Sequence, residues 1–373
     1  MKIFYYFLEY PTPMYQWQRS NLIDELERAG HEVVTFNPAL CESAAEAGEK
    51  ALALLREGGY NLFMSCDDQS VLLPDTMTRV RELGIPSLMI AWDNLELPYK
   101  QRRIAPLFDA VWLTSHETRY LFERWGCRNI HFATYAANPF TYRPAPYTDT
   151  LRSVGFIGSP YGSRTNKLND LVHAGIDTDV YSNALADSSV NNSVRGGHKK
   201  FNPLDVAVKA SRYLRFPIGR RVLASTILNK FHRDAPLDRQ APAFHAHPSV
   251  PFDEMTALYS AHALSLNITE LRDTYVLANP IPKIHLRTFE IPMCGGLQLT
   301  SRNDEIASYF DDRKEIVLYD SREEMADLCR YYLSPARDSE VRAMKEAARR
   351  RAESCHTWMH RLNPIFASLG LHS

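Results

Sequence analysis

The stretch that decides the fold is His285-Leu-Arg-Thr-Phe-Glu-Ile-Pro-Met-Cys-Gly-Gly-Leu-Gln-Leu-Thr300. It places Arg287, Thr288 and Glu290 within one expected helical turn, and the two adjacent glycines end that helix. The apolar run that follows has the length and composition of a strand. Such a helix–turn–strand unit is typical of an α/β protein. The polar residues indicate a ligand site, but a surface ion pair between Arg287 and Glu290 accounts for them equally well.

Outward from this unit, the chain alternates strand-like and helix-like segments along both halves. This alternation predicts βαβ units, parallel sheets and helices on both faces. The expected strands of the first half are 3–8, 31–36, 60–65, 86–91, 109–114 and 129–134. Those of the second half are 153–157, 179–182, 263–268, 297–300 and 315–319.

A proline-rich segment divides the two halves. Residues 139–149 hold three prolines without a clear period, so we expect a linker at 141–150 between domains 1–140 and 151–345. Both domains are expected to be Rossmann-like and doubly wound, facing each other across a cleft. In such sheets, ligands bind at the carboxyl ends of the strands.

Bulk composition excludes several classes of protein. The 373 residues carry a net charge of −1, so no overall field recruits nucleic acid, and we expect no nucleic-acid partner. Six dispersed cysteines without a C-x-x-C pair argue against a zinc site and a disulfide scaffold. The first apolar run is too short for a signal peptide, and no run of 18 apolar residues exists. We therefore expect a cytoplasmic protein.

Residues 183–248 interrupt the alternation and contain a basic insertion. Between Arg195 and Arg233 there are ten lysines or arginines against one acid, Asp205, with apolar residues interleaved. A solvated insertion of two short helices explains the pattern. An amphipathic basic surface that contacts anionic lipid or an acidic acceptor explains it as well.

Glycines follow the first strand of the second domain, in Phe156-Ile-Gly-Ser-Pro-Tyr-Gly-Ser-Arg164. Glycines at this turn let the backbone approach a diphosphate, and the next helix begins with its positive dipole end. Arg164 and Lys167, one turn apart, are candidates for neutralising the phosphates. Because the spacing matches neither G-x-G-x-x-G nor G-K-[ST], a simple turn before a basic helix stays an equal alternative.

In the first domain, several expected strands are followed by polar residues. Asp93 follows the most apolar of these strands, and we select it as a candidate base. Asp67 and Asp68 follow another strand, where N-capping is the simpler interpretation. No Ser/His/Asp arrangement suits a nucleophile, and no cluster has metal-ligand spacing, so no metal site is expected.

The second half resembles the CgeB-like (spore-maturation type) branch of the GT-B glycosyltransferases, relatives of glycosyltransferase family 4. The resemblance covers roughly 150–365. It rests on these segments: Gly158-Ser159 with Arg164, Tyr259–Asn267, Arg287–Gly296, Glu315–Tyr319 and Cys355–Arg361.

The resemblance implies a nucleotide-sugar site in domain 151–345, an acceptor site in domain 1–140, and helices in 346–373 that pack back on the latter. Glu290 would bind the ribose, and Arg164 with Lys167 the diphosphate. The remaining donor-binding residues are expected to be Gly158, Ser159, Asn267, Arg287 and Thr288. Pro282 stands where relatives place a glutamate on the donor sugar, so residues 273–279 are expected to supply those contacts.

The function that follows is transfer of a sugar from a nucleotide-sugar to an acceptor hydroxyl in glycan biosynthesis, with retention and without a bound metal or other cofactor. A UDP-sugar is the expected donor, with GDP- and dTDP-sugars as alternatives. The acceptor is expected to be a glycan, a protein or a lipid-linked molecule, with peripheral contact to an anionic inner membrane face through 195–233. A sugar-nucleotide epimerase or hydrolase and a non-catalytic sugar-binding module are the alternative functions.

Overall fold

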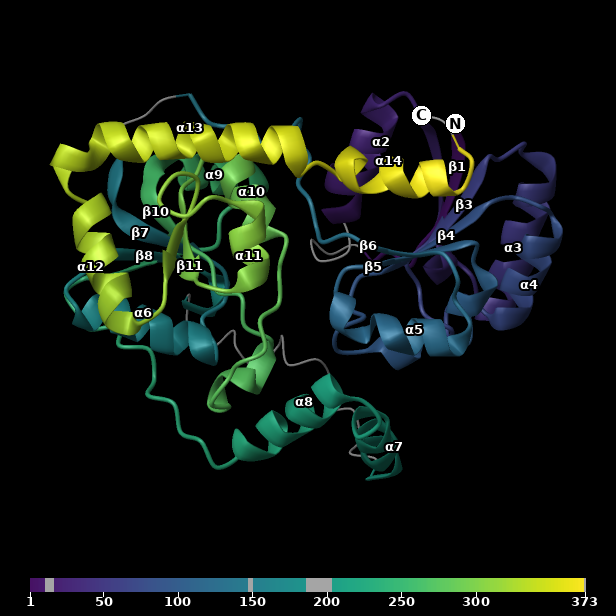
Figure 1. Cartoon of the computed structure of the whole chain (residues 1–373), viewed down its shortest axis with the longest axis horizontal. Helices are drawn as coiled ribbons and strands as arrows, with labels where there is room; N and C mark the ends of the chain where they lie inside the picture. Colours follow the sequence, from purple (N-terminus) through teal and green to yellow (C-terminus); the bar gives the residue numbers. More distant parts are fainter. Residues whose placement is uncertain (11–16, 147–149, 186–202, 372–373) are drawn as a thin grey trace. The chain divides into compact units, whose positions relative to one another are not determined.

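The computed structural model describes residues 1–10, 17–146, 150–185 and 203–371, and it divides into two compact units (Figure 1). Unit 1 comprises Met1–Thr141 and His356–Ser373, and unit 2 comprises Tyr142–Cys355. Each unit has one six-stranded sheet in which all strand pairs are parallel. The prediction of an α/β protein with two doubly wound sheets is confirmed.

The sheet of unit 1 has the order β2-β1-β3-β4-β5-β6. Its central strands are buried on both faces, as expected for a parallel sheet covered by helices. The strands are β1 (Lys2–Tyr6), β2 (Glu32–Phe36), β3 (Leu62–Ser65), β4 (Ser87–Ala91), β5 (Ala110–Leu113) and β6 (Ile130–Phe132). The α-helices are α2 (Asp24–Arg28), α3 (Ala44–Glu57), α4 (Pro74–Glu82), α5 (Arg119–Trp125) and α14 (Trp358–Ser368).

The last helix, α14, belongs to unit 1 and lies beside α2 (Figure 1). Both carboxylate oxygens of Glu25 on α2 accept hydrogen bonds from its first turn, from Trp358 N at 3.2 Å and Met359 N at 2.8 Å. The indole of Trp358 donates to Asn21 Oδ1 and is fully buried. A carboxylate at a helix amino terminus satisfies its unpaired N–H groups and complements its dipole.

The sheet of unit 2 has the order β12-β11-β10-β7-β8-β9. The strands are β7 (Leu151–Ile157), β8 (Thr178–Tyr181), β9 (Phe244–His247), β10 (His262–Leu266), β11 (Gln298–Ser301) and β12 (Val317–Tyr319). The α-helices are α6 (Ser163–His173), α7 (Pro203–Tyr213), α8 (Pro217–Leu228), α9 (Phe252–Ala261), α10 (Arg287–Met293), α11 (Asp304–Tyr309), α12 (Arg322–Tyr332) and α13 (Asp338–Cys355).

Two boundaries differ from those expected from the sequence. The interval 183–248, expected to be an insertion, ends in a strand of the sheet, β9. Its sequence Phe-His-Ala-His is too polar to be recognised as a strand. At the exposed edge of this strand, His245 and His247 form hydrogen bonds with Asp177 and Asp179. The terminal segment 346–373 divides between the units, because α13 runs to Cys355 within unit 2.

The described part of the basic insertion contains two helices, α7 and α8, and both interpretations of the insertion stay open. Helix α8 packs on the 3₁₀ segment η8 (Arg272–Val276), and α7 packs on α8. Arg195, Lys199 and Lys200 lie outside the described residues. Among the residues that are described, no helix is long and apolar enough to cross a membrane.

Candidate donor site

The connections of unit 2 place a ligand site at the carboxyl ends of β7 and β10. The chain runs from β7 to β8 and β9 on one side, and then returns to β10 on the other side of β7. Between two such strands the connecting loops diverge and leave a crevice, where ligands of doubly wound sheets bind. Gly158 follows β7 and Asn267 follows β10, so both predicted residues lie at this switch point.

A close approach between Gly158 and Arg287 defines the site. A Cβ atom at position 158 would lie 2.9 Å from Nη2 of Arg287, and the φ angle of Gly158 is +150°. An L side chain would therefore be strained and would displace the guanidinium. The glycine lets the backbone and the arginine of α10 meet at the end of β7.

Arg164 lies close enough to Arg287 for the two charges to interact. Burial lowers the pKa of Arg164, and the charge of Arg287 lowers it further. Its guanidinium stacks over the ring of Tyr161, 4.5 Å from the centroid, and donates to the carbonyl of Ser159 at 3.2 Å. Across the described part of the chain, neither arginine is within ion-pair distance of a carboxylate. Apart from the Glu290 carboxylate, whose charge interacts with Arg287, the two guanidinium groups carry excess positive charge, which suits a polyanion.

Lys167, the other predicted diphosphate ligand, is directed to a different partner. Its Nζ atom lies 5.2 Å from the centroid of the Tyr319 ring at the end of β12. The structure thus brings Arg164 together with Arg287, a pairing that the sequence analysis did not make.

Glu290 is buried in the first turns of α10. Its carboxylate accepts a 2.6 Å hydrogen bond from the hydroxyl of Tyr142, which lies in the expected linker. Burial raises the pKa of Glu290, while the bond from Tyr142 and the charge of Arg287 oppose the rise. The residue therefore has a structural partner within unit 2, in addition to its predicted role toward a ribose.

Asn267 and Thr288 position α10. Both side chains are buried, and Asn267 Nδ2 donates to Thr288 Oγ1 at 3.1 Å and to Gln298 Oε1 at 3.3 Å. These bonds join α10 to the end of β10 and the start of β11. Thr288 is fully buried, and its bond to Asn267 helps to orient the helix that carries Arg287 and Glu290; the expected contact of both residues with the donor stays a prediction.

Glu270 is a candidate that the sequence analysis missed. Its Oε2 atom is buried and has no hydrogen-bond partner among the described residues. The same holds for other polar atoms near the ends of β10 and β11, in Asn267, Thr269, Thr300 and Asn303. Buried polar atoms are normally paired, so such a cluster marks a place where a polar ligand or water completes the bonds. Apart from Asn267, which the resemblance had indicated, its members are polar residues without a motif, so the sequence carried no signal for them.

The backbone of Glu270 pairs with Pro282 in an isolated antiparallel bridge. Residues directly opposite each other in such a bridge direct their side chains to the same face. Glu270 therefore places a carboxylate beside position 282. Burial raises the pKa of Tyr319, and the charge of Glu270 raises it further.

In unit 1, the predicted base Asp93 follows β4 and is exposed. Its charge and, above all, burial raise the pKa of Tyr135. Asp67, at the end of β3, was expected to cap a helix but does not. Both of its carboxylate oxygens accept hydrogen bonds from Leu8 N, at 3.1 and 2.9 Å. Burial raises the pKa of Asp67 to about 7. Asp68 caps a turn by accepting from Ser70 N at 2.8 Å.

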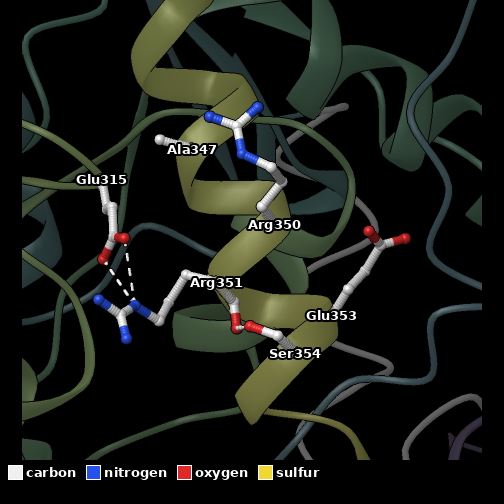
Figure 2. A pocket seen from close by; sticks show the side chains of 6 residues that line it. All are labelled: Glu315, Ala347, Arg350, Arg351, Glu353 and Ser354. Atoms are coloured by element: carbon white, nitrogen blue, oxygen red, sulfur yellow. Dashed lines mark hydrogen bonds and ion pairs between the residues drawn. The ribbon is translucent and has the colours of Figure 1, made fainter.

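Two surface hollows along α13 lie at the opposite end of the unit 2 sheet. Figure 2 shows one of them, where Arg351 Nε contacts the carboxylate of Glu315 at 3.0 and 3.1 Å, before β12 begins. The other is lined by Ser260 and Lys345, near the start of β10. Because both hollows lie where strands begin, neither is the ligand crevice of a doubly wound sheet. Among the described residues, no group of three or more His, Cys, Asp or Glu side chains is arranged to hold a metal ion.

Comparisons with known proteins agree with this geometry. Residues 205–367 match a family model described as glycosyl transferase-like. No match is found among curated proteins. Of the solved structures, HepE from Anabaena in complex with UDP has a TM-score of 0.58 and 11% identity, covering 99% of this chain and 100% of its own.

Sucrose-phosphate synthase from Thermosynechococcus elongatus has a TM-score of 0.55 and 12% identity, covering 99% of both chains. An α-glucosyltransferase in complex with UDP and a 13-mer DNA has a TM-score of 0.60 and 13% identity, also covering 99% of both chains. The chain has the GT-B fold of these proteins, and residues 205–367 are similar to the glycosyl transferase-like family.

Proposed function

We propose that this protein transfers a sugar from a UDP-sugar to an acceptor hydroxyl, with the diphosphate held by Arg164 and Arg287. The observation that carries the proposal is the Arg287 guanidinium against Gly158 at the end of β7, with Arg164 close enough for the two charges to interact. Negative charge on the leaving diphosphate grows as the sugar–phosphate bond breaks. Preorganised cations at that position lower the barrier of this step more than they strengthen ground-state binding.

UDP is the nucleotide we favour, because HepE and the α-glucosyltransferase, which share the fold, are described as UDP complexes. Glu290 is proposed to accept hydrogen bonds from the ribose diol. Glu270 is proposed to accept from hydroxyls of the donor sugar, since its unpartnered oxygen lies at the same edge of the sheet. Glu270 would thereby supply the carboxylate that relatives place at the position of Pro282, which has no carboxylate of its own.

We further propose a reaction that needs no bound metal, since the two arginines supply positive charge for the diphosphate. Retention of the anomeric configuration follows from the resemblance to the CgeB-like branch and family 4. On the acceptor side, Asp93 is the proposed base. Asp67 is the alternative candidate for the base, because a carboxyl with a pKa of about 7 is suited to proton transfer near neutral pH.

The test compares binding of UDP and of uridine to the wild-type protein, Arg164→Gln and Arg287→Gln. Both substitutions should weaken UDP binding at least tenfold and leave uridine binding within twofold, because only UDP carries the diphosphate. Arg330→Gln, on the exposed side of α12, is a matched control and should change neither. Equal loss for UDP and uridine, or no loss, would contradict the diphosphate role.

Turnover separates the classes of activity. A panel of UDP-, GDP- and dTDP-sugars is assayed with and without glycan, protein or lipid-linked acceptors. Transfer requires an acceptor for rapid nucleotide release, whereas a hydrolase or epimerase converts the donor alone. A sugar-binding module would show thermal stabilisation by the donor and no turnover. Asp93→Asn should abolish transfer and preserve UDP binding, and transfer that survives in this variant but is lost in Asp67→Asn would select Asp67.

A further inference from the structure

Helix α8 has an outward face that is apolar. Its buried face consists of Gly219, Val222 and Ser225. Successive residues of an α-helix are rotated by about 100° around the helix axis. By this rotation, a row of exposed residues lies opposite the buried face and spans an arc of about 100°. The row consists of Arg220, Ala224, Ile227, Leu228 and, one turn beyond the helix end, Phe231.

Exposure along this row is high for apolar side chains. Ile227 is 51% exposed, Leu228 47% and Phe231 81%, and Val208 and Leu214 of the preceding helix and turn are also exposed. Soluble surfaces seldom keep large apolar side chains contiguous in this way without a function in binding. The described residues leave this face uncovered.

Charge identifies the kind of partner. Residues 207–233 contain seven lysines or arginines and no aspartate or glutamate, although the whole chain has a net charge of −1. Arg220 belongs to the row itself, and Arg212 and Arg215, on α7 and in the turn that follows it, are also exposed. A second copy would bring two such basic faces together and repel itself. An anionic lipid surface complements the bases and accepts the apolar row at shallow depth.

We propose that α7, α8 and the turn up to Arg233 form a docking surface for an anionic membrane. Figure 1 shows both helices lying away from the six-stranded sheet of unit 2. The docking does not depend on the proposed transfer reaction. The two are linked in space, because the inner side of α8 packs on η8.

Contacts around η8 connect the docking surface to the donor site. The hydroxyl of Tyr275 in η8 donates to Asn229 Oδ1 at 3.1 Å, just beyond α8. The ring of the same tyrosine lies 3.1 Å from where a Cβ of Gly162 would stand, at the start of α6. Arg221 donates to the carbonyl of Asn279. A membrane bound by the outer side of α8 would therefore lie close to the donor loops, which favours an acceptor carried by lipid.

The experiment is co-sedimentation of the full-length protein with vesicles of phosphatidylcholine, with and without phosphatidylglycerol. The wild type should bind only vesicles that contain phosphatidylglycerol at about 0.01 M salt, and should be released at about 1 M salt, because screening shortens the range of the attraction. The variant Arg212→Glu/Arg215→Glu/Arg220→Glu should lose at least tenfold in partitioning. Arg221 is left intact because of its bond to Asn279.

The matched control is Arg81→Glu/Arg124→Glu/Arg128→Glu, which changes the net charge equally at exposed positions of unit 1. It should retain at least half of the wild-type partitioning. A second variant, Ile227→Ser/Phe231→Ser, keeps every charge and should also lose at least tenfold. Circular dichroism and UDP binding should be unchanged in all three variants.

Several outcomes would overturn the proposal. One is a wild type that ignores phosphatidylglycerol vesicles at low salt, and another is equal loss in the matched control. A concentration-dependent dimer that the Ile227→Ser/Phe231→Ser variant abolishes, without vesicle binding by the wild type, would instead assign this face to a second copy. Failure of vesicle binding with intact sugar transfer would leave the proposed function standing.

Discussion

The hydroxyl of Tyr142 donates a 2.6 Å hydrogen bond to the carboxylate of Glu290, 148 residues further along the chain. The first residue of unit 2 thereby holds a buried carboxylate at the start of α10. Because Arg287 begins the same helix, this bond also bears on the position of the guanidinium at Gly158.

Removing the donor of this bond should destabilise the protein. In Tyr142→Phe, the buried carboxylate of Glu290 loses its partner, and the free energy of unfolding should fall by about 1–3 kcal/mol. Urea denaturation at neutral pH measures the change. Tyr331→Phe is the matched control, since Tyr331 donates to Glu340 at 3.1 Å at an exposed site and its loss should cost less than about 0.5 kcal/mol. Equal effects of the two substitutions would contradict the assignment.

The proposed contact of Glu290 with the ribose predicts a selective loss. Glu290→Gln should weaken UDP binding by about 1.5–3 kcal/mol, the range for a hydrogen bond to a charged group. Binding of inorganic diphosphate should stay within twofold, because diphosphate has no ribose. Calorimetry with both ligands checks this, and unchanged UDP affinity would exclude the ribose role.

Gly158→Ala should impair donor binding through Arg287. The new Cβ would displace the guanidinium, and UDP affinity should fall at least tenfold. Gly175→Ala controls for backbone strain, because Gly175 also has a positive φ, +72°, but nothing lies within 4 Å of its Cβ position. Both variants should lose about 1–2 kcal/mol of stability, the cost of an L residue at positive φ. Only the first should lose affinity, and parallel losses would point to strain alone.

Glu270→Gln tests the sugar end of the site. The amide keeps the shape of the side chain but removes its charge, so transfer from a UDP-sugar should slow at least tenfold while UDP affinity stays within twofold. Steady-state rates and calorimetry give the two values. Glu323→Gln, with an exposed carboxylate on α12, serves as the control. A variant with normal transfer rates would remove Glu270 from the reaction.

Asp67 should make stability depend on pH. Its pKa is about 7 in the folded protein against 3.8 for an ordinary aspartate, so the folded state binds more protons than the unfolded chain between these values. The contribution of Asp67 to stability is therefore greatest below about pH 4, falls as pH rises to about 7, and then levels off. The total change is on the order of 4 kcal/mol.

Asp67→Asn cannot titrate and should flatten this dependence, with the variant more stable than the wild type above pH 7. Thermal unfolding from pH 4 to 8 measures the difference. Asp75→Asn, at an exposed position of α4, should follow the wild-type curve. Identical pH profiles for Asp67→Asn and the wild type would refute the assigned pKa.

The order of strands and helices was readable from the sequence because each element is local. Apolar runs separated by amphipathic helices predicted both parallel sheets, and the expected strands overlap those observed. The strand β9 was not predicted from the sequence. Its histidines lie at a sheet edge, where hydrogen bonds to aspartates of the β8 region stabilise them in place of burial. A period of apolar residues cannot reveal a strand whose outer side chains are polar.

The site depended on both levels. Gly158 and Arg164 were identified from a glycine turn after a strand with nearby bases, which suits a diphosphate, whereas Arg287 was identified from the polar cluster of 285–300 and from the resemblance. Their proximity was not predictable, because more than a hundred residues separate Arg164 from Arg287 and only the pairing of β7 with β10 brings their loops together. The bond from Tyr142 to Glu290 likewise joins residues 148 apart and was not predictable, and the unpartnered oxygen of Glu270 is visible only in the folded chain. Local sequence determined which elements form; the long-range register of the sheet decided which side chains meet, because burial and hydrogen bonding between distant segments exist only once the sheet has assembled.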